Sequence, residues 1–336
     1  MLVPGSIPNI IFSKSFKKLS IDKWKYLYKN TFFISLIFFG LAIIYLIIKI
    51  INSKSLLIDL KGQFDLSLVP FLFLVFILQF VNWSLEALKF KTILNEYYSI
   101  KFKTVLKSVY AGNFTALITP ERLGNFIGRF LVIKEDKKVI TLITIMGNLF
   151  QLLITVLMCL IGLIYILFSK LDTLFTNNTQ ILFILIFYFL GTFVLTAALF
   201  NFKWFSVFQN IKFLEKWYSK FVYLKNISLK SKLLTFTYAF ARYFIFTLQY
   251  YVLVKAFNLP IDVFQLIVYL GLLFGMVTFI PSLIPGNLGT REALCIILFS
   301  GSFIGIKFSL ISLLVWMINV GFSSLIGGLI LTFKRT

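Results

Sequence analysis

Two short segments of this chain combine helix-breaking residues with arginine inside otherwise apolar sequence. The first reads Thr119-Pro120-Glu121-Arg122-Leu123-Gly124 and is followed by Arg129, and the second reads Pro285-Gly286-Asn287-Leu288-Gly289-Thr290-Arg291-Glu292. Both contain the pattern Pro-x-x-Leu-Gly. Proline interrupts helices, arginine is costly in hydrocarbon, and a guanidinium can hold a phosphate or carboxylate with two parallel hydrogen bonds. The repeated pattern therefore predicts two embedded places that attract an anionic group.

Each segment offers an anion both charged donors and a broken helix. A helix that restarts after a proline presents unpaired N–H groups and the positive end of its dipole. The residues expected to bind the anion are Arg122, Arg129, Arg291, Glu292, Glu121 and Asn287, and those expected to shape the breaks are Pro120, Gly124, Pro285, Gly286 and Gly289. The alternative is structural: Arg122 pairs with Glu121, and Arg291 with Glu292, as internal struts.

Arginine is used sparingly and in particular places. The chain has five arginines against twenty-eight lysines, and four of the five lie in segments that we expect to be embedded. One of them, Arg242, is a secondary candidate for the site, together with Asn148 and Gln151, which share a helix face. The alternatives are that Arg242 and Glu86 extend to the membrane interface, and that the two amides only hold helices together.

The elements that must position these residues are membrane helices. Of the 336 residues, 60% are hydrophobic and the mean hydropathy is +0.95, which excludes an ordinary soluble domain. The runs long enough to cross a hydrocarbon core of roughly 30 Å are 31–51, 69–88, 139–168, 180–200, 233–257 and 308–331. The sequence therefore predicts an all-α polytopic membrane protein with about six full spans plus two helical hairpins.

The two motif segments fall in the connections between these spans. Residues 104–133 have short legs around Pro120, which suits a re-entrant hairpin. Residues 263–305 form the second hairpin, which is either re-entrant or fully spanning. Matching breaks in two halves of opposite orientation indicate an inverted repeat and a transporter-like binding site.

The net charge of +21 is carried mostly by loops on one side of the predicted spans. Twenty-three basic residues, Lys89 among them, fall in one set of loops and six in the other. Because basic residues mark the cytoplasmic side of membrane proteins, we expect both termini in the cytoplasm and the protein in the inner (plasma) membrane. The partners expected for this charge are membrane lipids, anionic phospholipids in particular, and not nucleic acid.

A single membrane domain is expected over 31–332, between a cytoplasmic N-terminal segment (1–30) and a cytoplasmic tail (333–336). Its polar linker, 203–230, has aromatic residues and lysines at the spacing of an amphipathic helix that lies at the interface. Histidine is absent, and Cys159 and Cys295 lie in apolar segments, which argues against a metal centre or a histidine-dependent enzyme. Neither a cofactor nor a catalytic residue is predicted.

The two motif segments resemble the signature segments of the lysylphosphatidylglycerol synthase transmembrane (flippase-like) family. The resemblance covers roughly residues 30–332 and rests on the arginines, the Arg291-Glu292 pair and the breaking prolines and glycines. It implies an integral inner-membrane protein associated with lipid translocation. Glu121, Asn125 and Asn287 depart from the family pattern. The resemblance is to the membrane region only, so synthase activity is not implied.

The function that these observations favour is translocation of an anionic phospholipid headgroup through a polar, arginine-lined cavity. A second hypothesis is a membrane-embedded transferase acting on a lipid-linked substrate, in which only Glu121 and Glu292 are placed to serve as a base. A third is a non-transporting accessory subunit whose arginines bind lipid.

Overall fold

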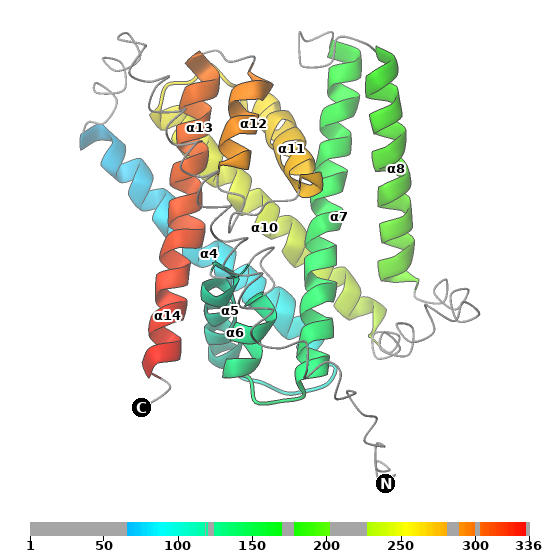
Figure 1. Ribbon diagram of the computed structural model, residues 1–336, viewed down its shortest axis with the longest axis vertical. Helices are drawn as coiled ribbons and strands as arrows, with labels where there is room; N and C mark the ends of the chain where they lie inside the picture. Colours follow the sequence, from blue (N-terminus) through cyan, green and yellow to red (C-terminus); the bar gives the residue numbers. More distant parts are fainter. Residues whose placement is uncertain are drawn as a thin grey trace, which may run out of the picture.

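The computed structural model of the protein describes residues 66–117, 119, 124–169, 178–201, 227–280, 289–299 and 303–333. All regular elements within these ranges are helices (Figure 1). In chain order they are η1 (Leu66–Leu68), α4 (Val69–Leu94), α5 (Phe102–Leu117), α6 (Gly124–Val132), α7 (Lys137–Ser169), α8 (Asn178–Phe200), α10 (Leu229–Ala256), α11 (Val263–Phe279), α12 (Thr290–Leu298), α13 (Phe303–Trp316), the π-helix η6 (Met317–Phe322) and α14 (Ser323–Phe333). The predicted class, an all-α membrane protein, is confirmed.

Four of the described helices are long and apolar enough to cross a membrane. They are Leu66–Leu94, Lys137–Phe168, Thr179–Phe200 and Ile304–Phe333, and they match four of the predicted spans. A fifth predicted run, 233–257, forms α10, whose 28 residues extend about 42 Å. Arg242 and several lysines make α10 less apolar than the other four. The first predicted span, 31–51, lies outside the described residues.

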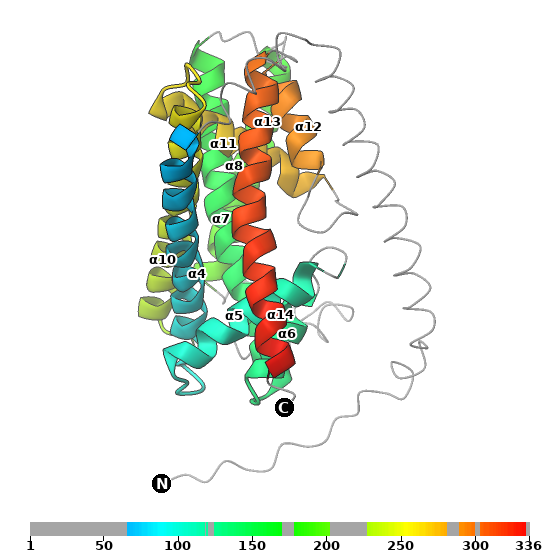
Figure 2. The same ribbon diagram turned by 90° about the vertical axis from the view of Figure 1, so that its left-hand side faces the viewer.

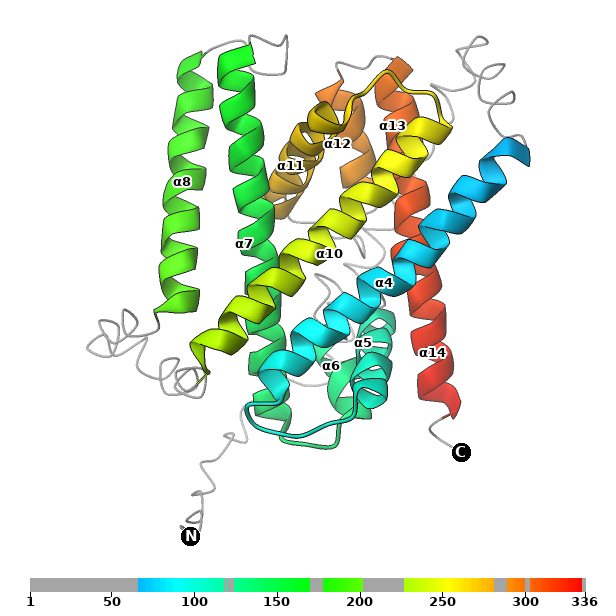
Figure 3. The same cartoon turned by 180° about the vertical axis from the view of Figure 1, so that it is seen from behind.

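The long helices run along the length of the molecule, and pairs of short helices lie at its two ends. α4 and α10 lie side by side and run in opposite directions (Figure 3), while α7 stands beside α8. α13, η6 and α14 form one continuous column (Figure 2). α5 and α6 lie at the lower end of Figure 1, and α11 and α12 at the upper end.

The hairpin predicted around Pro120 is present as α5 and α6, which have 16 and 9 residues. The two helices touch backbone to backbone, because a Cβ on Gly128 would overlap the carbonyl of Ala111. Thr115 Oγ1 ties them together by accepting from the Gly128 N–H at 3.0 Å. On its other side α5 packs against α14, where Gly327 lets the carbonyl of Tyr110 approach as closely. The hairpin is thus fixed from two sides.

The second hairpin, α11 and α12, lies at the opposite end of the molecule. α11 begins with a capping box, in which Asp262 accepts from the N–H of Gln265 and Gln265 accepts from the N–H of Asp262. α12 follows Gly289, which has a φ of 85°. With nine residues, α12 extends about 14 Å, less than half of a hydrocarbon core. Its length favours the short form of the 263–305 hairpin over a full pair of spans.

The buried apolar side chains form two clusters, one for each end. The upper cluster is centred on Tyr250, Phe257 and Phe308, and the lower one on Phe90 and Phe150. Each hairpin therefore packs against its own core. The exposed large side chains of α8 suit contact with lipid, because lipid tails are as apolar as the protein interior.

Several predicted positions lie outside the described residues. These are the cytoplasmic segment 1–30, most of the 203–230 linker, residues 334–336 of the tail, and the motif residues Pro120, Glu121, Arg122, Pro285, Gly286 and Asn287.

Candidate anion-binding site

Glu86 of α4 lies at the centre of a buried group of charges. Its Oε1 accepts a hydrogen bond from Arg129 Nη2 of α6 at 2.8 Å. Its Oε2 contacts Arg242 Nη1 of α10 at 2.7 Å and Lys89 Nζ of α4 at 2.6 Å. We call these four residues the Glu86 cluster. They meet where the α4–α10 pair passes the α5–α6 hairpin (Figure 3).

Aromatic rings support both guanidinium groups. The guanidinium carbon of Arg129 lies 4.4 Å from the ring centroid of Phe90, and that of Arg242 lies 4.8 Å from Trp83. A cation over an aromatic face is attracted by the ring quadrupole, more strongly where water is excluded. The rings therefore hold the guanidinium planes without taking up their N–H donors.

The cluster has hydrogen-bond donors that its carboxylate does not use. Arg129 Nε donates to Asn125 Oδ1 at 3.1 Å, and Arg242 Nε donates to Asn82 Oδ1 at 2.9 Å. In the described part of the chain, Arg129 Nη1 and Arg242 Nη2 donate to no group. Lys89 Nζ is buried and contacts only the carboxylate there. Within the described ranges, all three cations thus keep N–H groups that no other residue accepts.

The charges of the cluster do not balance. Among the described residues, three cations surround one carboxylate, which leaves two positive charges in excess. The side chains of Lys89, Arg129 and Glu86 are 1, 3 and 4% exposed, and that of Arg242 is 20% exposed. Buried charge without a counterion is strongly unfavourable, so the described part of the cluster is a candidate site for a further anion, with Arg242 at its accessible edge.

The structure argues against two alternatives and one expectation for these residues. Glu86 and Arg242 do not extend to the interface, because both point into the cluster. Lys89, which was counted among the lysines that orient the chain, is buried. Sequence reasoning missed Glu86 as the centre of the site. The available signal was the i, i+3 spacing of a carboxylate and an ammonium in an apolar helix, since such residues share a face.

Arg291 and Glu292 form the second buried charged site, at the start of α12. Arg291 Nη2 donates to Glu292 Oε1 at 2.6 Å and to the carbonyl oxygen of Ser312 at 3.0 Å. Glu292 Oε2 accepts from the N–H of Gly289 at 2.7 Å. One cation thus meets one carboxylate, and the carboxylate also caps the helix. This is the arrangement that the strut alternative predicted.

Polar side chains connect the two charged sites through η6. Asn319 of η6 accepts from Asn82 Nδ2 at 2.9 Å and donates to Gln249 Oε1 at 2.9 Å. Its carbonyl oxygen accepts from Trp83 Nε1 at 2.9 Å. A π-helix places this residue among α4, α10 and α14, and such turns occur often at functional sites. Asn319 therefore joins the Arg242 side of the cluster to the middle of α10.

The next residue of α10 continues the connection. Tyr250, which follows Gln249, has its hydroxyl 3.1 Å from Ser312 Oγ, and the Ser312 carbonyl accepts from Arg291. Buried hydroxyl groups such as these are tolerated in an apolar core because each of them has a hydrogen-bond partner.

The two amides predicted on α7 have different surroundings. Gln151 Nε2 donates to the carbonyl of Ala239 in α10 at 3.5 Å, as the interhelical alternative predicted. Asn148 is exposed. The structure places neither of them in a contact with the Glu86 carboxylate.

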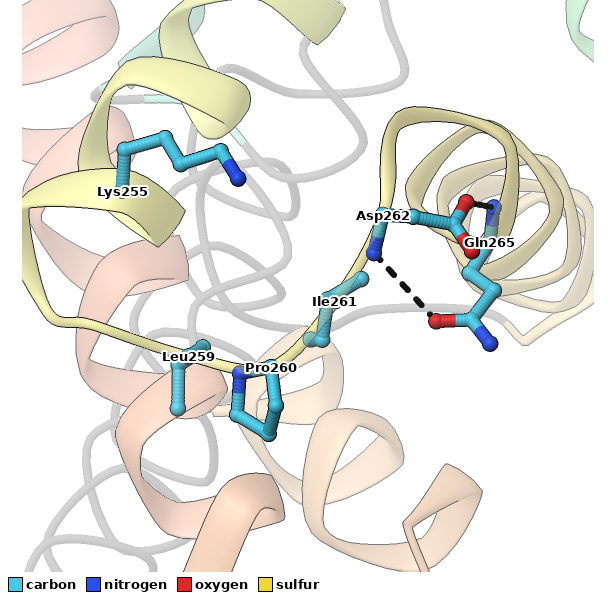
Figure 4. A pocket seen from close by; sticks show the side chains of 6 residues that line it. All are labelled: Lys255, Leu259, Pro260, Ile261, Asp262 and Gln265. Atoms are coloured by element: carbon cyan, nitrogen blue, oxygen red, sulfur yellow. Dashed lines mark hydrogen bonds between the residues drawn. The ribbon is translucent and has the colours of Figure 1, made fainter.

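An open groove of about 370 Å³ lies away from both charged sites, at the turn between α10 and α11 (Figure 4). It is lined by Lys255, Leu259, Pro260, Ile261, Asp262 and Gln265. The Asp262 and Gln265 side chains are engaged in the capping box, as the dashed lines of Figure 4 show. We read this groove as the outer surface of a turn.

Fold and sites together define a helical membrane protein with two buried charged centres. The family described as the lysylphosphatidylglycerol synthase TM region matches residues 32–327. The chain therefore belongs to this family, as the motif resemblance predicted, and is related to proteins that handle lipids. Searches among curated proteins and among solved structures found no significant match.

Proposed function

We propose that the protein binds the anionic headgroup of a phospholipid at the Glu86 cluster and translocates it between the leaflets of the inner membrane. The observation that carries this proposal is that, among the described residues, three cations surround one buried carboxylate and leave two positive charges in excess. Membership of a lipid-related membrane family supports it. Arg129 and Arg242 are the principal ligands, and Lys89 adds a third charge.

The chemistry of the cluster suits a phosphate group. Two guanidinium groups with unused N–H donors can each bind phosphate oxygens in a planar, bidentate manner. In a site of low dielectric these contacts are stronger than in water. A headgroup that exchanges its water shell for these donors can leave the interface while its acyl chains remain in lipid.

The architecture supports a transport role. The α5–α6 and α11–α12 hairpins lie at opposite ends of the molecule, and an inverted repeat would require such placement. We place the α5–α6 end, where α14 also terminates, on the cytoplasmic side, because most lysines of the sequence belong to that side. Arg291 and Glu292 then act as a fixed strut of the opposite end, and Arg122 remains a further candidate ligand.

Reconstitution in liposomes tests the proposal. Purified protein is inserted into vesicles that contain headgroup-intact, acyl-labelled phospholipids, and exposure of the label to an external quencher reports leaflet exchange. We expect exchange with the natural chain and a loss of at least about tenfold with Arg129→Gln or Arg242→Gln, since each removes a charge-assisted contact. Lys103→Gln, which removes an exposed lysine of α5, is the matched control.

The same vesicles separate the two alternatives. A covalently modified lipid, detected by mass spectrometry, would indicate the transferase. Binding of labelled lipid without exchange would indicate the accessory subunit. Glu292, one of the two carboxylates considered as a base, is already engaged by Arg291 and the N–H of Gly289.

A further inference from the structure

We infer that the headgroup taken by the Glu86 cluster carries a terminal phosphate monoester. This inference rests on the proposed function and narrows its substrate class. A phosphate monoester carries about −1.5 to −2 charges near pH 7. A phosphodiester headgroup, such as that of phosphatidylglycerol, has a single ionisable phosphate oxygen and carries about one negative charge.

Charge matching is the first argument. Lys89, Arg129 and Arg242 share one carboxylate, so a dianion balances the described residues of the cluster. Among these described residues a diester would leave one buried cation without a counterion, which is strongly unfavourable. A zwitterionic or aminoacylated headgroup would bring further positive charge to the site.

The number of donors is the second argument. Arg129 Nη1, Arg242 Nη2 and Lys89 Nζ each keep two N–H groups outside their contacts with the cluster's carboxylate. A terminal phosphate presents three oxygens to such a set, whereas a diester presents two that are not bridging. Three separate donor groups therefore match three terminal oxygens.

The space beside Lys89 is the third argument. Gly147 of α7 faces the lysine, and a Cβ built there would lie 3.5 Å from Lys89 Cε, with no atom of another described helix closer than 4 Å besides that one. The missing side chain leaves room next to a buried ammonium whose polar contact among the described residues is the Glu86 carboxylate. Arg129 and Arg242 together with Glu86 carry a net charge of +1, which a monoanion would balance. Lys89 raises this net charge to +2, so it is the residue that favours a dianion over a monoanion.

Lipid exchange at pH 7 tests this assignment. Vesicles contain phosphatidic acid or phosphatidylglycerol with the same labelled acyl chains. We expect the natural chain to exchange the monoester at least about tenfold faster, and Lys89→Met to bring the two rates together by slowing the monoester. Lys103→Met is the control that should keep the preference. Equal rates for the natural chain, or a preference unchanged by Lys89→Met, would overturn the inference.

A second variant covers the case in which Lys89→Met fails to fold. Gly147→Leu fills the space beside the ammonium and keeps every charge. We expect it to slow exchange of the monoester more than exchange of the diester, with an unchanged elution profile on size exclusion. Exchange of both lipids at natural rates would show that no ligand occupies this space, and would overturn the inference.

Two further measurements distinguish a lipid ligand from free phosphate, one in detergent solution and one in proteoliposomes. Inorganic phosphate, but not dimethyl phosphate at equal ionic strength, should raise the thermal midpoint of the detergent-solubilised protein, and Lys89→Met should abolish the difference. Uptake of radiolabelled phosphate into proteoliposomes would identify free phosphate as the cargo and overturn the assignment to a lipid. Stabilisation by phosphate without exchange of any lipid would keep the ligand chemistry and refute the proposed function.

Discussion

The two buried charged sites differ in how their charges are matched. At the start of α12, one arginine meets one carboxylate, and Glu292 also caps the helix. At the Glu86 cluster, three cations from three helices share one carboxylate. A matched pair is complete without a ligand and serves to fix a helix end. Among the described residues the cluster lacks a matching anion, so the charge imbalance, and not the presence of arginine, marks the candidate site.

The largest expected effect comes from removing the only described carboxylate of the unmatched cluster. Glu86→Ala leaves three buried cations without their counterion, and the free energy of unfolding should fall by at least about 3–5 kcal/mol. Thermal and denaturant unfolding in detergent measure this loss. Added phosphate should restore part of it. A variant as stable as the natural chain would show that the cluster is not charged as described.

The second largest effect is expected from a substitution that breaks the matched pair of Arg291 and Glu292. Arg291→Ala orphans Glu292, and we expect a loss of about 3 kcal/mol in the same unfolding measurement. The double variant Arg291→Met/Glu292→Leu removes both charges and should regain most of this loss, because well-packed apolar residues often replace a buried ion pair at little cost. A double variant as unstable as the single one would contradict the strut.

The connection between the two sites should contribute less. Asn319→Ala leaves Asn82 and Gln249 without their shared partner, and we expect a loss of about 2 kcal/mol. Because the connection crosses η6, this variant should also slow lipid exchange. Asn148→Ala, at an exposed amide, is the control and should change neither quantity.

Removing one cation from the unmatched cluster should affect stability little. In Arg129→Gln the carboxylate keeps Lys89 and Arg242, so we expect a change within about 1 kcal/mol, although lipid exchange falls at least about tenfold. The comparison with Arg291→Ala is decisive, since both remove a buried arginine. Equal losses of stability in these two variants would remove the distinction between the sites.

The smallest effect concerns an exposed carboxylate that joins the end of α4 to the start of α10. Ser228 and Ser231 donate hydrogen bonds to Glu96, and these bonds hold the pKa of its carboxyl below the usual value. Because the folded pKa is lowered, the stabilisation is present above about pH 4–5 and is lost as the pH falls through the folded pKa. This contribution to the free energy of unfolding should be less than about 1 kcal/mol, because the carboxylate is exposed. Glu96→Gln should abolish it, as measured by unfolding between pH 3 and 7.

Much of the fold could be predicted from the sequence because its signals are local. Hydropathy predicted four runs that form helices long and apolar enough to cross a membrane, and the breaking residues near 120 and 285 predicted the two pairs of short helices. The strut between Arg291 and Glu292 could be foreseen as an alternative because its partners are neighbours in the chain. The role of Gly128 in bringing α5 and α6 into contact could not be predicted, because it depends on the backbone of Ala111, which lies opposite Gly128 only in the folded protein.

The amino-acid sequence by itself determined that this chain forms membrane helices, where they break, and that Arg129, Arg242 and Arg291 lie within them. Only the tertiary structure decided the partners of Glu86, since Arg129 and Arg242 lie 43 and 156 residues away along the chain. The physical reason is that hydrophobicity and helix breaking act over one or two turns, whereas a charge selects its counterion by distance in the folded protein.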